Sequence, residues 1–388
     1  MPREQLEKTG VTVRDAGPGD AVSGVRPSWV VLPETVEEVS SVLRACTEHD
    51  LAVVPVGGGT KLHWGRPPER CDVLLDLCCL NEVLEHAAGD LVVRTQAGVT
   101  MGALAAALAE KGQELALDAA PEATVGGTLA TATAGPRAFR HGTARDLLIG
   151  ITVVLADGTV ARSGGKVVKN VAGYDLGKLF TGSYGTLGVI AEATFRLHPL
   201  PAESRWVVAE VEPSRLREVA AALAASQTEP SAVEIDRPGP EGPVTLAVLV
   251  EGTAAEPRAL ALREITGGGE VMGEPPSWWG VIPQDEVLVE VRFLPSALDG
   301  VLDAAREAGF RLRGSPVSGR LHLTPAGDAG AGTLARLRER TGRMTVLATQ
   351  REDVDRWGEV GALPLMRRVK ERFDPGRTLS PGRFLGGI

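Results

Sequence analysis

The sequence predicts an α+β protein built from two parts, and three observations support this class. Its 388 residues are enough for two domains of ordinary size. Up to residue 201, short apolar strands alternate with helices and with segments rich in glycine and other small residues. Beyond the prolines near residue 201, strands alternate with amphipathic helices. We therefore predict an N-terminal extension over 1–22, a first domain over 23–201, a second over 202–360 and a C-terminal segment over 361–388.

The elements of the first domain follow from local patterns. Residues 28–50 predict a strand and a helix, since Thr35 and Glu38 have the spacing of a capping box. Strands are predicted over 51–56 and 91–98, and a helix over 100–112 that begins after Thr100 and stops at Gly112. Residues 149–162 predict a hairpin turning at Asp157-Gly158, and residues 185–201 a strand that ends in prolines.

The second domain shows one order of elements twice. A strand over 205–212, a helix over 214–226, strands over 231–236 and 244–252 and a helix near 258–265 form the first round. A strand over 286–295, a helix over 296–309, strands near 310–324, a helix over 333–342 and a strand over 344–350 form the second. Each round matches a split βαβ module, so we expect a duplicated sheet-and-helix unit.

Charge and composition exclude several classes of function. A net charge of −9 argues against a nucleic-acid surface, because phosphate backbones require a basic face. No stretch approaches the roughly 18 apolar residues that a membrane-spanning helix needs, and the N-terminus does not resemble a secretory signal. The four cysteines fit neither a zinc site nor a disulfide framework. We expect reduced thiols, no metal site and a cytoplasmic protein.

Three glycine-dense segments indicate a phosphate ligand. The first, "PVGGGTKLHWG" over 55–65, places three glycines after a predicted strand, where backbone N–H groups can form an anion-binding turn. It matches neither the P-loop nor the dinucleotide fingerprint, because the spacing and the following helix are wrong. Segments 120–135 and 164–190 are similarly rich in glycine and small residues. The alternative is a set of ordinary tight turns.

The segments "PVGGGTK", "PEATVGGTLATATAG", "VVKNVAGYDLGKLFTGSYGTLGVI" and "FDPGRTLSPGRF", in this order, resemble one known superfamily. It is the FAD-binding superfamily of vanillyl-alcohol oxidase and p-cresol methylhydroxylase, and within it the FAD-binding subunits of bacterial glycolate oxidases. The resemblance covers about residues 23–201 and the tail. It implies an α+β fold with a two-part FAD-binding domain of the p-cresol methylhydroxylase type, an α/β cap domain and a C-terminal segment that returns to the FAD-binding domain.

The resemblance also implies which residues contact FAD. Some members attach the flavin through a His at the position of Gly59, so non-covalent FAD is expected here. The expected contacts come from the three loops, from the basic turn that follows the second loop and from the tail. They are Pro55, Val56, Gly57, Gly58, Gly59, Thr60, Lys61, Pro121, Glu122, Thr124, Val125, Gly126, Gly127, Thr131, Ala134, Gly135, Arg140, His141, Gly142, Gly185, Gly188, Val189, Ile190 and Arg383.

Catalytic residues are harder to predict. Oxidation of a 2-hydroxy acid needs a base for the hydroxyl proton and cations for the carboxylate. Related catalytic subunits are expected to carry a His-x-His and Gly-Asp-Gly-Asn cluster, which this chain lacks; its His322 is alone and better explained as structural. His141, in a basic turn, and Tyr174 are the candidates, although a solvated turn and a packing tyrosine explain them equally well. The tail cations Arg367, Arg368, Lys370 and Arg372 are expected to form a solvated helix face.

The resemblance predicts the FAD-binding subunit of a glycolate-type 2-hydroxy acid oxidase or dehydrogenase. Its expected partners are a second flavin subunit and an iron–sulfur subunit, through which a cytoplasmic chain would lie at the inner face of the membrane. One alternative is a self-sufficient FAD-dependent alcohol or hydroxy-acid dehydrogenase. A second is a non-catalytic scaffold that has kept the flavin fold.

Overall fold

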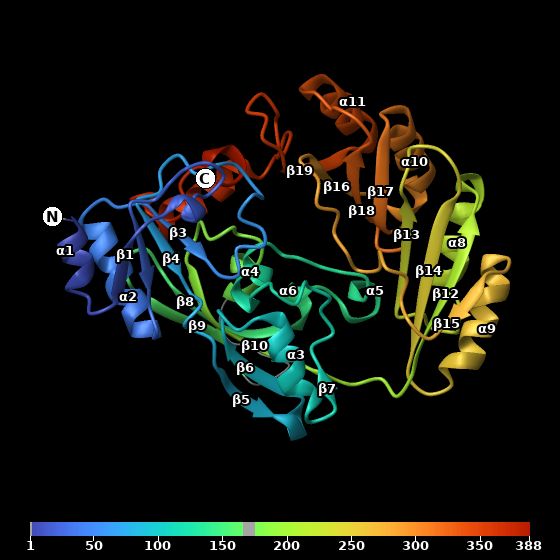
Figure 1. Ribbon diagram of the computed structural model, residues 1–388, viewed down its shortest axis with the longest axis horizontal. Coiled ribbons are helices and arrows are strands. Elements are labelled where there is room, and N and C mark those ends of the chain that lie inside the picture. Colours follow the sequence, from blue (N-terminus) through green and yellow to red (C-terminus); the bar gives the residue numbers. More distant parts are fainter. Residues whose placement is uncertain (1, 166–174) are drawn as a thin grey trace. The chain divides into compact units, whose positions relative to one another are not determined.

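The computed structural model describes residues 2–165 and 175–388. The chain divides into two compact units, and Figure 1 labels most of their elements. The first unit comprises Met1–Thr133, Thr143–Leu200 and Val360–Ile388, and the second comprises Ala134–Gly142 and Pro201–Glu359. Each unit has its own hydrophobic core.

The first sheet of unit 1 has four strands in the order β1-β2-β4-β3. They are β1 (Thr12–Asp15), β2 (Trp29–Leu32), β4 (Val73–Asp76) and β3 (Val53–Val56), and β4 pairs in parallel with both β2 and β3. Short helix α1 (Pro2–Glu7) precedes β1, and helix α2 (Val36–Glu48) connects β2 to β3. The Thr35 hydroxyl accepts from the Glu38 N–H at 3.1 Å, which confirms the predicted N-cap of α2.

The second sheet of unit 1 is antiparallel, with the order β5-β6-β10-β8-β9. Its strands are β5 (Val83–Ala87), β6 (Val92–Gln96), β10 (Val189–Arg196), β8 (Leu148–Val154) and β9 (Val160–Gly164). The predicted hairpin is confirmed as β8–β9, with Val154 opposite Val160. Four helices surround the apolar core of this sheet: α3 (Met101–Ala109), α4 (Val125–Ala130), α6 (Ala144–Leu147) and α7 (Leu176–Phe180). Two further strands of two residues each, β7 (Gln113–Glu114) and β11 (His198–Pro199), pair with one another.

The C-terminal segment belongs to unit 1. Helix α12 (Leu363–Phe373) is followed by Leu379, which forms a parallel bridge with Val53 of β3. The expectation that Lys370 lies on a solvated face is wrong: it is 5% exposed, and its Nζ donates to the Thr186 and Leu379 carbonyls at 2.8 and 2.9 Å. The sequence does not indicate that Lys370 is buried, because its burial depends on the counter-ion Asp374. This carboxylate lies four residues away and is itself completely buried.

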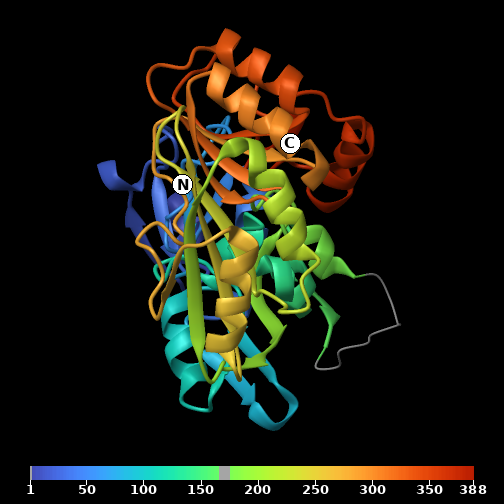
Figure 2. The same ribbon diagram turned by 90° about the vertical axis from the view of Figure 1, so that its right-hand side faces the viewer.

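Unit 2 is an eight-stranded antiparallel sheet in the order β15-β12-β14-β13-β17-β18-β16-β19. The strands are β12 (Ser204–Val211), β13 (Ala232–Arg237), β14 (Val244–Glu251), β15 (Glu270–Met272), β16 (Leu288–Arg292), β17 (Phe310–Ser315), β18 (Arg320–Pro325) and β19 (Arg343–Ala348). Four helices pack on one face through a single apolar cluster (Figure 2): α8 (Pro213–Ala224), α9 (Ala255–Thr266), α10 (Leu298–Glu307) and α11 (Ala331–Thr341).

The predicted duplication is confirmed by the topology of this sheet. Both halves have the chain order β-α-β-β-α-β, from β12 to β15 and from β16 to β19. Within each half the strands lie in the spatial order fourth, first, third, second, and β13 pairs with β17 to join the halves. The joined sheet thus has one covered apolar face and one face on which alternate residues are polar.

Residues 134–142 lie with unit 2, although the sequence analysis kept them in the FAD-binding domain. Their short helix α5 (Ala138–His141) contacts β13. Arg137 pairs with Glu251 at 3.5 Å, and Arg140 pairs with Glu229 at 3.3 Å. These ion pairs could not be predicted from the local sequence, because the partner residues lie about 90 to 115 positions away.

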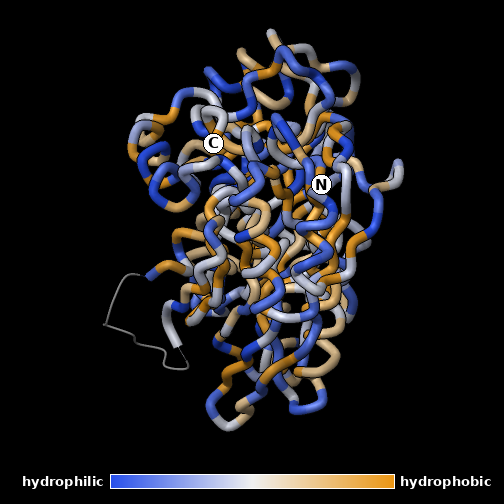
Figure 3. The backbone as a smooth tube through the Cα atoms, turned by 90° about the vertical axis from the view of Figure 1, so that its left-hand side faces the viewer, coloured by the Kyte–Doolittle hydropathy of each residue, from blue (hydrophilic) through white to orange (hydrophobic). Residues whose placement is uncertain are grey.

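Over the described residues, 2–165 and 175–388, no helix is long and apolar enough to cross a membrane. Figure 3 shows the same pattern, because hydrophobic stretches of the backbone are short and alternate with hydrophilic ones.

Candidate functional site

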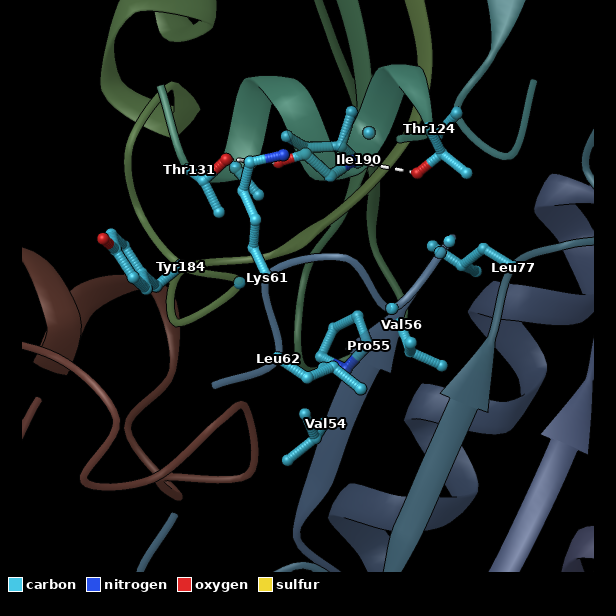
Figure 4. A pocket seen from close by; sticks show the side chains of 18 of the residues that line it. Val54, Pro55, Val56, Lys61, Leu62, Leu77, Thr124, Thr131, Tyr184 and Ile190 are labelled. Carbon is cyan, nitrogen blue, oxygen red and sulfur yellow. Dashed lines mark hydrogen bonds between the residues drawn. The ribbon is translucent and has the colours of Figure 1, made fainter. Parts of the chain in front are cut away.

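A cavity in unit 1 brings together three segments that are distant in sequence (Figure 4). The first is the end of β3 with the loop after it, the second is the N-cap and body of α4, and the third is the turn that leads into β10. The lining residues are Val54, Pro55, Val56, Gly57, Gly58, Gly59, Thr60, Lys61, Leu62, Leu77, Ala97, Thr124, Gly126, Gly127, Ala130, Thr131, Tyr184, Gly185, Gly188, Val189, Ile190 and Arg383.

Glycine is required at the three positions of the first loop for two different structural reasons. A Cβ at Gly57 would lie 2.1 Å from the Thr124 Oγ1, and a Cβ at Gly58 would lie 2.2 Å from the Glu122 carbonyl oxygen. Both positions need glycine because the second loop packs directly on the first. Gly59 has space around it but a φ of +69°, which side-chain-bearing residues rarely adopt.

The first loop presents an array of open backbone donors. Within the described part of the chain, none of the N–H groups of residues 57–61 donates a hydrogen bond to a protein acceptor. Consecutive N–H groups in an irregular turn form a concave site for an anion. This array is the strongest chemical feature of the cavity, because it offers donors that the fold itself does not use.

The second loop uses its N–H groups internally. Val125 donates to the Val99 carbonyl at 2.9 Å, Gly126 to the Ala97 carbonyl at 2.8 Å and Gly127 to the Thr124 hydroxyl at 3.2 Å. A Cβ at Gly126 would lie 2.8 Å from the Ala97 Cβ. These residues therefore fix the shape of the wall, whereas the first loop supplies the donors.

The third segment and the tail complete the wall. Tyr184 has a φ of 56° and Gly185 a φ of +72°, so a left-handed turn leads into β10. The Tyr184 ring stacks on Phe384, with centroids 5.3 Å apart. Arg383, 4% exposed, donates from Nη2 to the carbonyls of Leu62 and Trp64 at 2.9 and 2.8 Å. Through these two hydrogen bonds the tail fixes the chain that follows the first loop.

Lys61 adds a positive charge to the cavity. Figure 4 shows its side chain extending from the first loop toward α4. Its Nζ lies 3.4 Å from the Thr60 Oγ1, and none of the described carboxylates pairs with it. Burial lowers the pKa of this ammonium group. A phosphate in the cavity would restore the lost solvation by direct contact.

The structure separates the residues that the sequence analysis placed at one site. Most of them line this cavity, from Pro55 to Lys61, at Thr124, Gly126, Gly127 and Thr131, in the turn and strand from Gly185 to Ile190, and at Arg383. Pro121, Glu122 and Val125 do not line it, and Val125 is buried. Ala134, Gly135, Arg140, His141 and Gly142 lie in unit 2. Tyr174 lies outside the described residues.

Six residues of the cavity wall were not among those predicted from the sequence. They are Val54, Leu62, Leu77, Ala97, Ala130 and Tyr184. Five are apolar residues whose position depends on strand direction and packing. Tyr184 had a visible signal, since it is the single aromatic residue within the small-residue run "TGSYGT".

A row of charged side chains crosses the polar face of the unit 2 sheet. Asp236, Arg313, His322 and Glu290 are successive cross-strand partners on β13, β17, β18 and β16. Arg313 bonds to Asp236 at 2.7 Å, and Arg320 pairs with Glu290. The row is ordered by ion pairs rather than by apolar packing.

Two groups in this row have shifted pKa values. Burial alone would raise the pKa of Glu290, but the Arg320 and Arg292 cations outweigh it and lower that pKa to about 2. Burial, followed by the Arg320 cation, lowers the pKa of His322 to about 4. At neutral pH the carboxylate is therefore charged and the imidazole neutral. Over the described residues, no group of three or more His, Cys, Asp or Glu side chains is arranged to hold a metal ion.

Comparison with known proteins identifies the cofactor of the part of the chain that contains most of the cavity wall. Residues 27–164 match the family model described as "FAD binding domain". This part of the chain is an FAD-binding domain. The expected membership in the vanillyl-alcohol oxidase and p-cresol methylhydroxylase superfamily is thereby confirmed for this domain, and FAD is the cofactor.

Two curated relatives each match a little less than half of the chain. Glycolate oxidase subunit GlcD of Bacillus subtilis is 37% identical over 188 residues, which are 48% of this chain and 40% of that protein. D-lactate dehydrogenase [cytochrome] 1, mitochondrial, of Saccharomyces cerevisiae is 37% identical over 179 residues, which are 45% of this chain and 30% of that protein. The matched segment thus spans less than half the length of each relative.

A solved structure shows the fold of the whole chain. Physcomitrella patens BBE-like 1 superimposes with a TM-score of 0.71, covering 98% of this chain and 97% of that one at 16% identity. The likeness confirms the α+β class that the sequence predicted. At this identity it shows the fold and no more.

The cavity of the FAD-binding domain fits a dinucleotide by its own geometry. Five open N–H groups and an ammonium without a described counter-ion suit a diphosphate, and glycine at 57 and 58 lets the second loop pack directly against this array. The apolar wall formed by residues such as Val54, Leu77 and Ile190 suits flat ring surfaces.

A Lys61→Met substitution should weaken FAD binding by roughly tenfold, because a charge-assisted hydrogen bond to phosphate is lost. The dependence of the dissociation constant on salt should also become shallower, since one cation no longer contributes. Fluorescence titration of the apoprotein with FAD at low and high salt measures both effects. Lys111→Met, at an exposed position, is the matched control and should change neither. If the two variants bound FAD equally tightly, Lys61 would not contribute to FAD binding.

Proposed function

We propose that this chain is an FAD-dependent oxidoreductase that acts on the CH–OH group of a small 2-hydroxy acid. The observation that carries the proposal is the open N–H array of residues 57–61 within a domain of the FAD-binding family. The relatives support the substrate class, because the names of two of them specify glycolate and D-lactate. More narrowly, we propose the FAD-binding subunit of a glycolate-type oxidase or dehydrogenase.

The chain's own residues would position both reactants. The backbone N–H groups of residues 57–61 and the Lys61 ammonium group would bind the diphosphate. Arg383 fixes the conformation of that loop by donating to the carbonyls of Leu62 and Trp64. Bound FAD supplies the acceptor for two electrons and a proton. Since Gly59 has no side chain to form a covalent link, the cofactor is held by non-covalent contacts alone.

A site for the substrate carboxylate is available on the polar face of unit 2. Arg313 pairs with Asp236, Arg292 and Arg320 pair with Glu290, and His322 is neutral. The guanidinium groups of these three arginines would recognise a substrate carboxylate. His141 and Tyr174 remain the proposed acid–base residues.

The proposed setting is a complex. A second flavin subunit and an iron–sulfur subunit would accept electrons from this chain, in the cytoplasm and at the inner face of the membrane. The name of the Bacillus subtilis relative supports a subunit role. The D-lactate dehydrogenase relative supports a second candidate, a chain that oxidises its substrate by itself.

Anaerobic reduction tests the proposal. We expect the protein loaded with FAD to lose its flavin absorbance when glycolate or D-lactate is added together with the co-expressed partner subunits. Bleaching without partners would instead establish the self-sufficient enzyme. An Arg320→Met variant should raise the substrate concentration for half-maximal bleaching about tenfold while FAD binding is retained. A chain that binds FAD but is never reduced, with or without partners, would contradict the proposed activity and leave a scaffold role.

A further inference from the structure

Arg237 occupies a core position in unit 2. It is the last residue of β13, and alternation places it on the same face as Val233 and Ile235, both of which belong to the apolar cluster beneath the helices. The side chain is 2% exposed and heads the largest fully buried side chains of the described residues. A guanidinium at the end of an apolar row needs a chemical reason, because an unpaired buried charge is costly.

The described protein atoms satisfy little of this guanidinium. Its Nε lacks a hydrogen-bond partner, and its Nη2 donates one long bond, 3.5 Å, to the Leu302 carbonyl. No described carboxylate lies within ion-pair distance of it. Burial lowers the pKa of the group, and Glu241 and Asp303 offset this only in part. The side chain thus has donors and charge to offer.

A cavity of about 380 Å³ lies against Arg237. The start of α8, the loop after β13 and one side of α10 form its walls. Its second cation, Arg306, already has acidic neighbours, with Glu241 and Asp303 each 3.8 Å away. Arg237 is therefore the cation in this cavity that has no described carboxylate within ion-pair distance.

We propose that this cavity is a binding site for a small organic acid, whose carboxylate pairs with Arg237. Because Nε is covered, a planar carboxylate would accept from the Nη end of the guanidinium, a flat donor edge that arginine offers and lysine does not. Three carboxylates, Glu212, Glu241 and Asp303, also line the cavity, so an acid with a single negative charge is repelled less than a phosphate dianion. The site lies entirely in unit 2, and its existence does not depend on FAD or on the proposed oxidation.

An intramolecular partner is the competing explanation. The Glu241 side chain is 74% exposed in the loop after β13, and a rotation could bring it to Arg237. If Glu241 were that partner, its removal would destabilise unit 2 and leave no role for an external acid. If the proposal is right, Glu241→Gln removes a repulsive charge and strengthens carboxylate binding.

The test uses the full chain and sodium acetate as the probe, with sodium chloride at equal ionic strength as the blank. We expect saturable acetate binding by ligand-observed NMR and a rise of about 2–4 °C in the melting temperature. Arg237→Met should fold with an unchanged or higher melting temperature in chloride, since apolar replacement of a buried charge is often stabilising. It should bind acetate at least tenfold more weakly, as should Arg237→Lys, which lacks the planar fork. Arg263→Met, at an exposed position on α9, should bind like the parent.

Three results would overturn the proposal. Acetate binding that survives in Arg237→Met would place the site elsewhere. No acetate binding to the parent, together with a lower melting temperature in Glu241→Gln, would show that Glu241 is the partner. Arg237-dependent binding of inorganic phosphate that is tighter than binding of acetate would exclude the carboxylate assignment.

Discussion

A Gly58→Ala substitution should weaken FAD binding by roughly 10- to 100-fold, because a single methyl group forces two loops apart. The new Cβ would lie 2.2 Å from the Glu122 carbonyl oxygen, a backbone atom that cannot rotate away. The loop of residues 57–61 would have to shift, and its open N–H groups would lose their alignment. Fluorescence titration with FAD measures the loss, and circular dichroism checks that the fold is kept.

Gly89→Ala is the matched control for this experiment. It makes the same chemical change in the same unit, at a position where no heavy atom lies within 4 Å of the added Cβ. Its affinity for FAD should equal that of the parent chain. If Gly58→Ala bound FAD as tightly as Gly89→Ala, the contact between the first two loops would not control the cofactor site.

Removing the carboxylate of Asp374 should cost about 3–5 kcal/mol of the free energy of unfolding of unit 1. Asp374 is fully buried and accepts from Lys370 at 2.5 Å, from the Thr378 N–H at 2.9 Å and from the Leu379 N–H at 2.8 Å. Asp374→Ala would leave the Lys370 ammonium buried without its counter-ion. Urea denaturation followed by circular dichroism measures the loss.

An exposed ion pair between the tail and the segment before β4 serves as a control. Arg377 pairs with Glu69 at 2.9 Å, and both side chains are about half exposed. Glu69→Gln should therefore change stability by less than about 1 kcal/mol. Replacing both members of the buried pair by apolar residues, as in Lys370→Met with Asp374→Leu, should recover much of the loss. A cost for Asp374→Ala no larger than that for Glu69→Gln would contradict the structural role assigned to the buried pair.

The tail matters for function because of where it attaches. Leu379 bridges Val53 at the start of β3, and the chain leaves β3 directly into the cofactor loop. Arg383 then bonds to the carbonyls that follow that loop. A released tail would therefore loosen the N–H array as well as the fold, which links the stability of the C-terminus to FAD affinity.

Features with a local physical cause could be predicted from the sequence. The caps at Thr35 and Thr100 need a hydroxyl and the N–H three residues later, and both hydrogen bonds are present. The turn at Asp157-Gly158 joins two strands that pair as expected. Repetition of element order was enough to predict the duplicated unit 2, since each half folds by the same local pattern.

Features that depend on distant partners could not be predicted. The basic turn at residues 134–142 was placed with the FAD-binding domain, yet its ion pairs tie it to unit 2. Lys370 was predicted to be a solvated charge, because its buried carboxylate partner and its carbonyl acceptor come from tertiary packing. Arg237 ends a strand of ordinary polarity, and only the packing of α10 shows that it is buried.

The α+β class, the order of elements and the glycine loops of the FAD-binding domain follow from local sequence, because caps, turns and small residues act over a few positions. Tertiary packing alone explains why Gly57 and Gly58 must be glycine, which N–H groups stay open and which charges are buried. These properties arise where segments distant in sequence pack together, and the free energy of a buried charge or a backbone contact depends on the partner it meets there.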